Sequence, residues 1–374
     1  MEHCIYHSRD LDGLTSGAVI YSHQKSFGED CNLVGYDYGE KLDTRKFKGK
    51  TTCMIDVSMP MDRMETLGNG CMEFIWIDHH ISALEQLKKY CEEKSYQIKE
   101  SKINGLITCY EVTKMNMIYY FSDKLSGCEI ASALYGRGLK TESKKLVQIL
   151  GQYDTWRNSS EKMFTNDFDW NEVVMPIQYA MRLKTTPKEV YDVFEQIDWS
   201  GYQLSIEELK MIGRSILLYQ KQQNKTLCEK SLFEFEMKGL KVVALNTTGF
   251  NSLSFEGFYW PEIHDVMMPF SYNGKSEMWN FSMYTTKEEI DILSIAKDFG
   301  GGGHKMACGF QLPSEQVRFT KNGIEFGPAI ILDLNMLPEN FEMKPKEIIE
   351  VLKTQQFIPV INEKKGSEIN QVKK

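Results

Sequence analysis

The sequence has few features that would place the protein outside a reducing, aqueous compartment. Its nine cysteines are scattered, odd in number and never arranged as Cys-x-x-Cys, so they predict neither a disulfide framework nor a structural zinc site. The first residues lack the basic and apolar regions of a signal peptide, and no stretch approaches the roughly 20 apolar residues of a membrane span. We therefore expect a soluble, cytoplasmic protein without a membrane partner.

An excess of positive charge is also missing. Lysine and arginine number 44 against 52 acidic residues, which gives a formal net charge of −8. Proteins that bind long duplex DNA non-specifically use a basic surface to release counterions, so this class is excluded. A nucleotide site is not excluded, because bound cations or a local basic patch can supply the positive field.

The N-terminal half alternates apolar runs with helical patterns. Strands are predicted at 4–6, 33–36, 51–55 and 74–77, and helices at 14–20, 61–67, 82–90, 126–135 and 143–153, with Ser82 as the cap of the third helix. Strands that alternate with helices through short loops form a parallel, doubly wound α/β sheet. At 374 residues the chain is also long enough for a second domain.

The C-terminal half predicts a smaller α/β domain with a mixed sheet. Its pattern favours strands at 233–237, 240–245 and 278–284, a helix at 290–299, and then a strand at 329–334 and a helix at 346–352. We expect a catalytic domain over 1–186, a helical linker over 187–230, a substrate-binding domain over 231–315, and an extension over 316–374 whose tail, after about 363, is disordered.

Polar clusters follow three of the four N-terminal strands. Taken alone, Asp78-His79-His80 is as compatible with a polar turn that caps a helix as with a site. The carboxyl ends of parallel strands meet at one edge of a sheet, where ligands bind, so the recurrence favours a site. The candidate ligands are His7, Asp10, Asp12, Asp56, His79 and Asp154.

This mixture of carboxylates and imidazoles suits Mn²⁺ or Mg²⁺ better than a structural zinc ion, which prefers thiolates. A pair of such ions, about 3.5–4 Å apart with a shared carboxylate, supplies a hydroxide nucleophile and clamps a phosphoryl group. Without cations, so many acids at one edge would repel one another.

Four consecutive glycines, 300–303, precede His304 and Lys305. Such a run is costly in chain entropy, but it lets the backbone N–H groups approach an anion closely. The alternative is a hinge after a helix C-terminus. The adjacent histidine and lysine favour a site that holds a phosphate or nucleotide. Trp156 is interpreted as a packing residue, and His3, His23 and His264 as surface or structural residues.

These motifs together resemble the DHH phosphoesterase superfamily with its associated C-terminal domain. The matching residues are Asp10-Leu11-Asp12-Gly13, Asp56, Asp78-His79-His80, Asp154 and the Gly-Gly-Gly-His signature that ends at His304. Residues 279–284 and 295–299 are most similar to the oligoribonuclease NrnB-like branch, also described as cyclic-nucleotide phosphodiesterase-like.

The resemblance implies a role for each of these residues. His7 and Asp10 would hold one manganese ion, Asp12, His79 and Asp154 the other, and Asp56 would bridge them, with Mg²⁺ or Co²⁺ as substitutes. Asp78 and His80 would be catalytic, Asp78 by orienting the site and His80 by facing the substrate phosphate. The substrate, in a cleft between the domains, would be bound by Gly301, Gly302, Gly303, His304 and Arg157.

By the same resemblance we expect a manganese-dependent phosphodiesterase that hydrolyses short single-stranded oligonucleotides of the nanoRNA type to 5′-mononucleotides. Linear or cyclic dinucleotides, cyclic mononucleotides or another small phosphorylated compound are alternative substrates. Relatives carry an arginine two residues after the counterpart of Ser282, where this chain has Tyr284, and this departure bears on the grip on a terminal phosphate. A homodimer is common among relatives.

Three further hypotheses are weaker. A pyrophosphatase is disfavoured because a separate glycine-loop domain suits a substrate with a nucleoside. A RecJ-type exonuclease is disfavoured because the sequence shows no basic, aromatic-rich single-strand domain. The alternative outside enzymes is a nucleotide-sensing protein on a degenerate fold, which the intact acids at 10, 12, 56, 78 and 154 disfavour.

Overall fold

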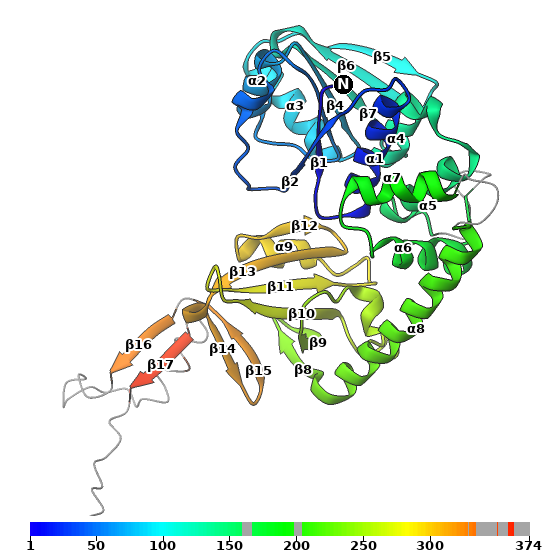
Figure 1. Ribbon diagram of the computed structural model, residues 1–374. Helices are drawn as coiled ribbons and strands as arrows, with labels where there is room; N and C mark the ends of the chain where they lie inside the picture. The colour runs from blue at the N-terminus through cyan, green and yellow to red at the C-terminus, as the bar shows by residue number, and fades with distance from the viewer. Residues whose placement is uncertain (159–166, 198–203, 328, 334–349, 351–357, 363–374) are drawn as a thin grey trace, which may run out of the picture. The chain divides into compact units, whose positions relative to one another are not determined.

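The chain divides into two compact units, Met1–Tyr219 and Gln220–Lys374, and each is treated by itself (Figure 1). The computed structural model describes residues 1–158, 167–197, 204–327, 329–333, 350 and 358–362. Two helices, α7 (Pro187–Ile197) and α8 (Ile206–Ser231), lie where the sequence predicts a helical linker. The four-part division of the chain stays a prediction.

A seven-stranded sheet organises the first unit. Five neighbouring strands are parallel and two strands at one edge are antiparallel, in the order β2-β1-β3-β4-β7-β6-β5. The strands are β1 (His3–His7), β2 (Asn32–Tyr36), β3 (Thr51–Ile55), β4 (Glu73–Asp78), β5 (Lys99–Ile103), β6 (Ile107–Val112) and β7 (Met117–Phe121). The predicted parallel sheet is confirmed.

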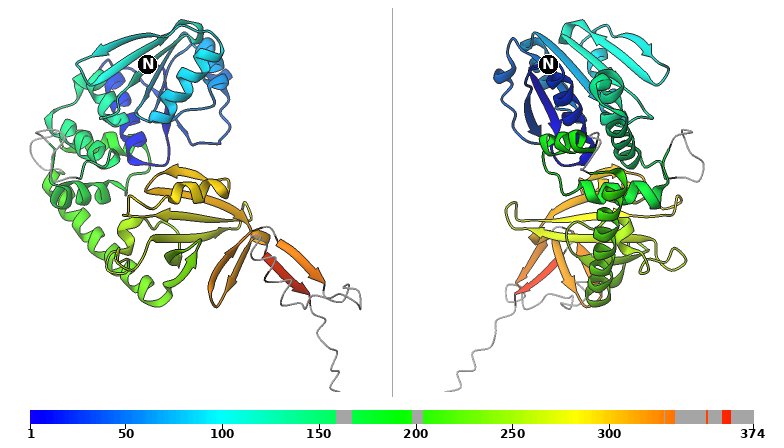
Figure 2. Two further views of the ribbon diagram at one scale, coloured as in Figure 1. Left: turned by 180° about the vertical axis from the view of Figure 1, so that it is seen from behind. Right: turned by 45° about the vertical axis from the view of Figure 1, so that its right-hand side comes forward.

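Helices cover both faces of this sheet, as a doubly wound fold requires (Figure 2). Cys4 and Tyr6 of β1 face one core and Ile5 faces the other, because successive strand residues point to opposite faces. The first core is covered by α1 (Leu11–Lys25), α4 (Gly127–Tyr135), α5 (Thr141–Asp154), α6 (Met175–Met181) and α7; the second is covered by α2 (Met61–Gly70) and α3 (Ile81–Glu93).

The strand order places the polar clusters side by side. The chain leaves β1 to form β2 on one side of it and β3 on the other, so the order reverses at β1. In such sheets a ligand binds outside the carboxyl ends at the reversal. Register pairs Tyr6 with Ile55 and Ile55 with Ile77. The residues that follow, His7 and Asp56 among them, therefore meet at one edge.

The second unit is the expected α/β structure with a mixed sheet. Its six strands run β12-β13-β11-β10-β9-β8, with β9 and β10 parallel and the other pairs antiparallel. They are β8 (Phe233–Met237), β9 (Leu240–Asn246), β10 (Val266–Asn273), β11 (Met278–Tyr284), β12 (Gly302–His304) and β13 (Ala307–Pro313). The helix α9 (Ile292–Asp298) packs on one face, over a core that includes Phe281 and Phe310.

Two further strand pairs follow. A hairpin of β14 (Val317–Thr320) and β15 (Gly323–Phe326) adds Ile324 to the core of the second unit, and β16 (Ala329–Asp333) pairs with β17 (Ile358–Asn362). The strand expected at 329–334 is confirmed. The expected helix at 346–352 and the tail after 363 lie outside the described residues, apart from residue 350. No helix in the described part of the chain is long and apolar enough to cross a membrane.

Candidate metal centre

Two groups of side chains converge at the carboxyl edge of the first sheet, and both are made of predicted ligands. In the first group, Nδ1 of His7 lies 2.6 Å from Oδ2 of Asp10 and 3.7 Å from Oδ2 of Asp56. In the second, Nε2 of His79 lies 3.2 Å from Oδ2 of Asp154 and 3.8 Å from Oδ2 of Asp12. The structure thus brings together all six residues.

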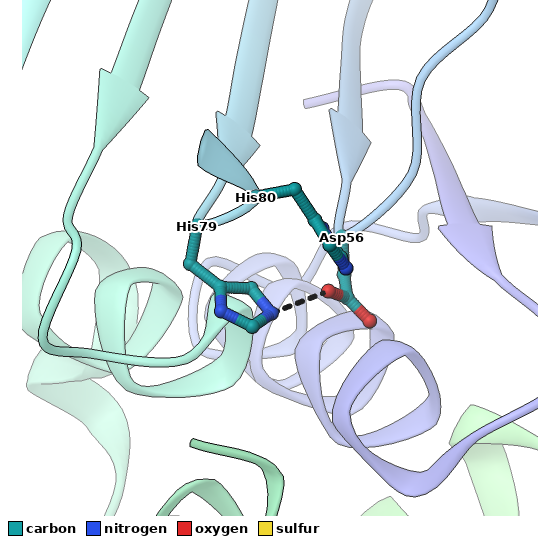
Figure 3. A group of neighbouring side chains, drawn as sticks. All are labelled: Asp56, His79 and His80. Atoms are coloured by element: carbon teal, nitrogen blue, oxygen red, sulfur yellow. Dashed lines mark ion pairs between the residues drawn. The ribbon is translucent and has the colours of Figure 1, made fainter. Parts of the chain in front are cut away.

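Asp56 stands between the two groups. Its Oδ2 faces His7, while its Oδ1 lies 3.3 Å from Nε2 of His79 (Figure 3). The residue is 1% exposed, and its φ of 59° is in the left-handed region, which few non-glycine residues occupy. The backbone is held there by a hydrogen bond from its N–H to the carbonyl of Ile77. The geometry is that of a carboxylate with one oxygen for each of two sites.

The start of α1 positions two of the acids, Asp10 and Asp12. Asp10 caps the helix, with Oδ1 accepting the N–H of Gly13 at 2.9 Å, so that its Oδ2 is directed at His7. A Cβ on Gly13 would stand 2.1 Å from the carbonyl oxygen of His7, so the motif needs glycine here. Asp12 lies buried in the first turn and accepts N–H groups from Gly127 and Cys128 at the N-terminus of α4.

Asp78 lies behind the ligands, whereas His80 lies with Asp56 and His79 in a third group of side chains that could hold a cation. The Oδ1 atom of Asp78 accepts the backbone N–H groups of His79 and His80 and lies 2.6 Å from Nδ1 of His80. Asp78 is fully buried, whereas the side chain of His80 is 37% exposed. Asp78 thus orients both histidines, and His80 reaches solvent beside Asp56 and His79. Because Asp78 already holds these N–H groups, α3 begins after His80, and the prediction of a Ser82 cap is wrong.

The histidines and acids of the cluster shift one another's pKa. Burial alone would lower the pKa of the two histidines, but the neighbouring carboxylates outweigh it and raise the pKa of His7 to about 10 and of His79 to about 12. Burial, and then the charge of Asp12, raises the pKa of Asp56 well above its ordinary value. Burial, and then the charge of Asp154, raises the pKa of Asp12. The cluster therefore favours added positive charge.

The nitrogen and oxygen atoms of the cluster are better placed to bind divalent cations than to form hydrogen bonds with one another. Nδ1 of His7, Nε2 of His79 and Oδ2 of Asp56 are buried, yet among the described residues none makes a hydrogen bond of normal geometry, although each lies within 4 Å of an opposite charge. Buried polar atoms are normally satisfied, so an orphaned set is unusual. Lone pairs that converge on shared points, with nitrogen and oxygen donors, suit Mn²⁺ and related ions.

Arg157 is not where the sequence interpretation placed it. Its guanidinium donates to both carboxylate oxygens of Glu129, at 2.6 and 3.0 Å, and lies 3.4 Å from Asp167. The side chain is only 2% exposed. A buried arginine that is committed to two acids stabilises the fold behind Ser126 and α4, so the expected role in substrate binding is wrong.

The glycine loop belongs to the second unit and combines structural and open positions. Gly300 (φ 75°) ends α9, with its N–H and that of Gly301 bonded to Lys297 and Ala296. A Cβ on Gly301 would stand 2.1 Å from the carbonyl of Gly309, and one on Gly303 would stand 2.6 Å from Cα of Cys308. Local backbone conformation or close packing explains glycine at these three positions, so the alternative of a hinge after the helix accounts for part of the run.

Neither backbone conformation nor close packing requires glycine at position 302. A Cβ there would meet no atom within 4 Å, and its φ is not in the left-handed range. It lies on β12, the edge strand of the sheet, beside the exposed His304. Edge strands leave backbone groups without partners in the sheet. An exposed glycine that the fold does not require leaves this backbone open to a ligand.

Sequence reasoning missed two contributors to the centre. Asp37 directly follows β2, and its Oδ1 lies 3.5 Å from Nε2 of His7. The signal was present, because an acid at the end of a predicted strand is the same pattern that singled out Asp56. Gly127 is the other, since a Cβ there would stand 2.9 Å from Oδ2 of Asp12 and 3.0 Å from Cβ of Asp56. Nothing in the local sequence indicates that approach.

No family model and no curated protein matches this sequence. Among solved structures, the chain is similar to PggH, a pGpG-specific phosphodiesterase from Vibrio cholerae, at 12% identity and a TM-score of 0.46, over 84% of this chain and 95% of that one. It is also similar to exonuclease RecJ bound to manganese, at 14% identity and a TM-score of 0.42, over 83% and 86%.

A third likeness is to a DHH domain from a protein described as a member of a family of ribosomal proteins, at 12% identity and a TM-score of 0.49, over 82% and 81%. Values this low assign neither an activity nor a substrate to this chain. Independently of these likenesses, the motif residues and the strand ends at which they meet resemble those of the DHH phosphoesterase superfamily.

Proposed function

We propose that this protein is a metal-dependent phosphodiesterase that acts on short oligonucleotides and releases 5′-mononucleotides. The observation that carries the proposal is Asp56, whose two carboxylate oxygens face two separate groups of ligands. A strained, buried carboxylate in this place serves two neighbouring cations and little else. Superfamily likeness supports hydrolysis of a phosphoester, and the substrate and the ion are our inference.

In this proposal Asp56 would contribute one carboxylate oxygen to each of two ions. His7 and Asp10 would hold one manganese ion, and Asp12, His79 and Asp154 the other, with Mg²⁺ or Co²⁺ as substitutes. When bound, the ions would supply a nucleophilic hydroxide at neutral pH and neutralise charge on the phosphoryl oxygens.

The chain's own residues would do the positioning. Asp78 holds the turn that presents His79 and His80, so the two imidazoles keep a fixed relation to Asp56. His80 is the more exposed of the two, at 37%, and its Nδ1 lies against Asp78, which leaves Nε2 as the atom for a substrate phosphate oxygen. The open backbone at Gly302 and His304 would hold a second phosphate or sugar of the substrate.

Two alternatives stay open within the same chemistry. Linear or cyclic dinucleotides and cyclic mononucleotides also carry a phosphodiester and a nucleoside. Tyr284, at a position where relatives have arginine, is half-buried on β11, so it adds no cation for a terminal phosphate.

The nine cysteines, all free and buried, fit a reducing cytoplasm, and a homodimer stays a prediction.

The test uses the full chain with Mn²⁺ and a panel of short RNAs, short DNAs, linear and cyclic dinucleotides, cyclic mononucleotides and pyrophosphate. Mononucleotide release from short RNA, lost in Asp56→Asn and Asp78→Asn, is the expected result. Asp30→Asn is the matched control, because the Asp30 side chain is 79% exposed and paired with a surface lysine. Absence of turnover of every phosphoester with Mn²⁺, Mg²⁺ and Co²⁺ would overturn the proposal.

A further inference from the structure

An aromatic cluster of the first unit adjoins the candidate metal centre. Tyr153 and Trp156 flank Asp154 at the C-terminal end of α5. Tyr153 stacks on Trp170 with ring centroids 5.6 Å apart and an interplanar angle of 4°, and Trp156 meets Trp170 edge-on at 5.1 Å. Trp156 is 47% exposed, so the sequence interpretation of it as a packing residue accounts for only half of its ring.

The backbone of Trp156 is a second observation. At the end of α5, the N–H of Trp156 bonds to Tyr153 and that of Arg157 bonds to Gln152, while Trp156 itself has a left-handed φ of 52°. The helix α9 ends with the same pattern of bonds, but with Gly300 in the left-handed position. Glycine adopts this conformation without strain and tryptophan does not. Helix termination therefore does not explain a tryptophan here.

A cation adds charge selectivity to the cluster. The guanidinium carbon of Arg182 lies 4.3 Å from the ring centroid of Tyr179 and 5.8 Å from that of Tyr153, and an N–H donates to the Tyr153 hydroxyl at 3.1 Å. Arg182 is exposed. Aromatic faces beside an exposed guanidinium suit a ligand that has both a flat π-system and a negative charge.

We propose that Trp156, Trp170 and Tyr153 form a platform on which one nucleobase of the substrate stacks, with its phosphodiester at the centre that includes Asp154. This inference rests on the proposed function and narrows it to substrates that carry a base. Every base has a π-face, so the platform selects nucleotides over base-free phosphoesters without selecting among bases. A strained residue beside a reactive centre fits such a role.

The kinetic test compares an RNA dinucleotide with the same dinucleotide lacking its bases. In Trp156→Gly, kcat/KM for the dinucleotide should fall about 5- to 150-fold, the range for loss of one stacked base, while kcat/KM for the abasic compound stays unchanged. Trp156→Phe should keep most of the activity. The Tm of Trp156→Gly should change little, because relief of the left-handed backbone offsets the lost contact with Trp170, whereas a role in packing alone predicts a lower Tm.

Phe27→Ala is the matched control. Phe27 is an exposed aromatic residue just past the C-terminal end of α1, which runs back from the carboxyl edge of the sheet, so it lies away from the metal centre. It should alter neither reaction. An equal loss on both substrates in Trp156→Gly would mean that the residue only positions Asp154, and would overturn the platform.

Calorimetry separates the platform from the activity. The full chain is titrated with 5′-AMP and with ribose 5-phosphate. We expect 5′-AMP to bind more tightly, and the difference to vanish in Trp156→Gly. Base-dependent binding through Trp156 in a protein that cleaves no phosphodiester would retain the platform and remove the proposed function. Equal binding of 5′-AMP and ribose 5-phosphate to a protein that cleaves phosphodiesters would overturn the platform and retain the proposed function.

Discussion

The candidate metal centre and the glycine loop present their polar groups in opposite ways. At the centre, side chains do the work: Asp12, Asp56 and Asp78 are 2% exposed or less, and each is held by backbone hydrogen bonds or a strained φ. In the loop, the backbone is the group that we propose to bind substrate, and Gly302 and His304 are exposed at a sheet edge. Buried charge needs an enclosing fold, whereas an exposed backbone needs only the absence of side chains.

This difference has an energetic consequence. Burial, and then the charge of a neighbouring acid, raises the pKa of Asp56 and of Asp12, so bound cations would relieve electrostatic strain at the centre. The loop stores little strain, since glycine permits Gly300 and Gly303 their conformations. Substitutions should therefore act on cation binding and chemistry at the centre, and on folding or substrate affinity in the loop.

The largest effect is expected at the residue that both groups share. Asp56→Asn should lower kcat on a short RNA or dinucleotide by about 10³-fold, because the amide supplies one neutral oxygen where two charged ones serve. Calorimetric titration with Mn²⁺ should show fewer ions bound per chain than in the unmodified protein. Retention of both ions and of most activity would show that Asp56 does not bridge.

Gly301→Ala should act on the fold of the second unit. Its Cβ would stand 2.1 Å from a backbone oxygen of β13, and overpacking of this kind costs roughly 1–3 kcal/mol. Urea denaturation followed by circular dichroism measures this loss. Affinity of the first unit for Mn²⁺, measured in the same variant, should stay unchanged.

Gly302→Ala is the complementary variant in the same loop. The added methyl group meets nothing within 4 Å, so the stability of the second unit should be unaffected. If the open backbone holds the substrate, the methyl group would keep a phosphate oxygen away from the backbone N–H, and loss of one charge-assisted hydrogen bond costs about 1.5 kcal/mol. KM should then rise about tenfold with kcat nearly constant. An unchanged KM for every substrate of the panel would count against the loop as a binding element.

The smallest effect is a pH dependence of metal stabilisation. In the cation-free protein the raised pKa of His7, about 10 against an ordinary 6.5, means that its pairs with acids stabilise the fold fully below pH 6.5 and lose this effect as pH rises through 10. A bound cation needs the imidazole neutral, so protons compete with it less as pH rises.

The gain in Tm on adding Mn²⁺ should therefore increase from about pH 6 to about pH 8. Differential scanning fluorimetry with and without the ion measures it. Calorimetry in buffers of different ionisation enthalpy should show release of protons on binding. A Tm gain independent of pH, without proton release, would contradict the assignment of His7 and His79 as ligands.

Much of the fold was predictable because its signals are local. Apolar runs of β-branched and aromatic residues identified β1 to β4, and the polar residues after β1, β3 and β4 identified the edge where ligands gather. The edge strand β5, with the sequence Lys-Glu-Ser-Lys-Ile, carries four exposed residues and no apolar pattern. Its place is decided by antiparallel pairing with β6 across a short hairpin, and the period-2 pattern of the sequence does not report this pairing.

The candidate site divides in the same way. Residue types, most of them at strand ends, were enough to name the six candidate ligands and the glycines of the loop. The supporting role of Asp78 was implied only by the resemblance to the superfamily. The division of the two oxygens of Asp56 between His7 and His79 was decided by register between neighbouring strands. The ion pair of Arg157 with Glu129 was decided by packing, which a lone arginine shortly after Asp154 in the sequence does not reveal.

The sequence by itself therefore determined which chemistry is present: acids and imidazoles that suit divalent cations, and a glycine run that exposes backbone. Only the tertiary structure decided which atoms share a centre, which arginine is occupied, and that Trp156 presents half its ring to solvent beside Asp154. The physical reason is that donor type and chain flexibility are properties of single residues, whereas distance, burial and charge environment arise only when distant segments pack.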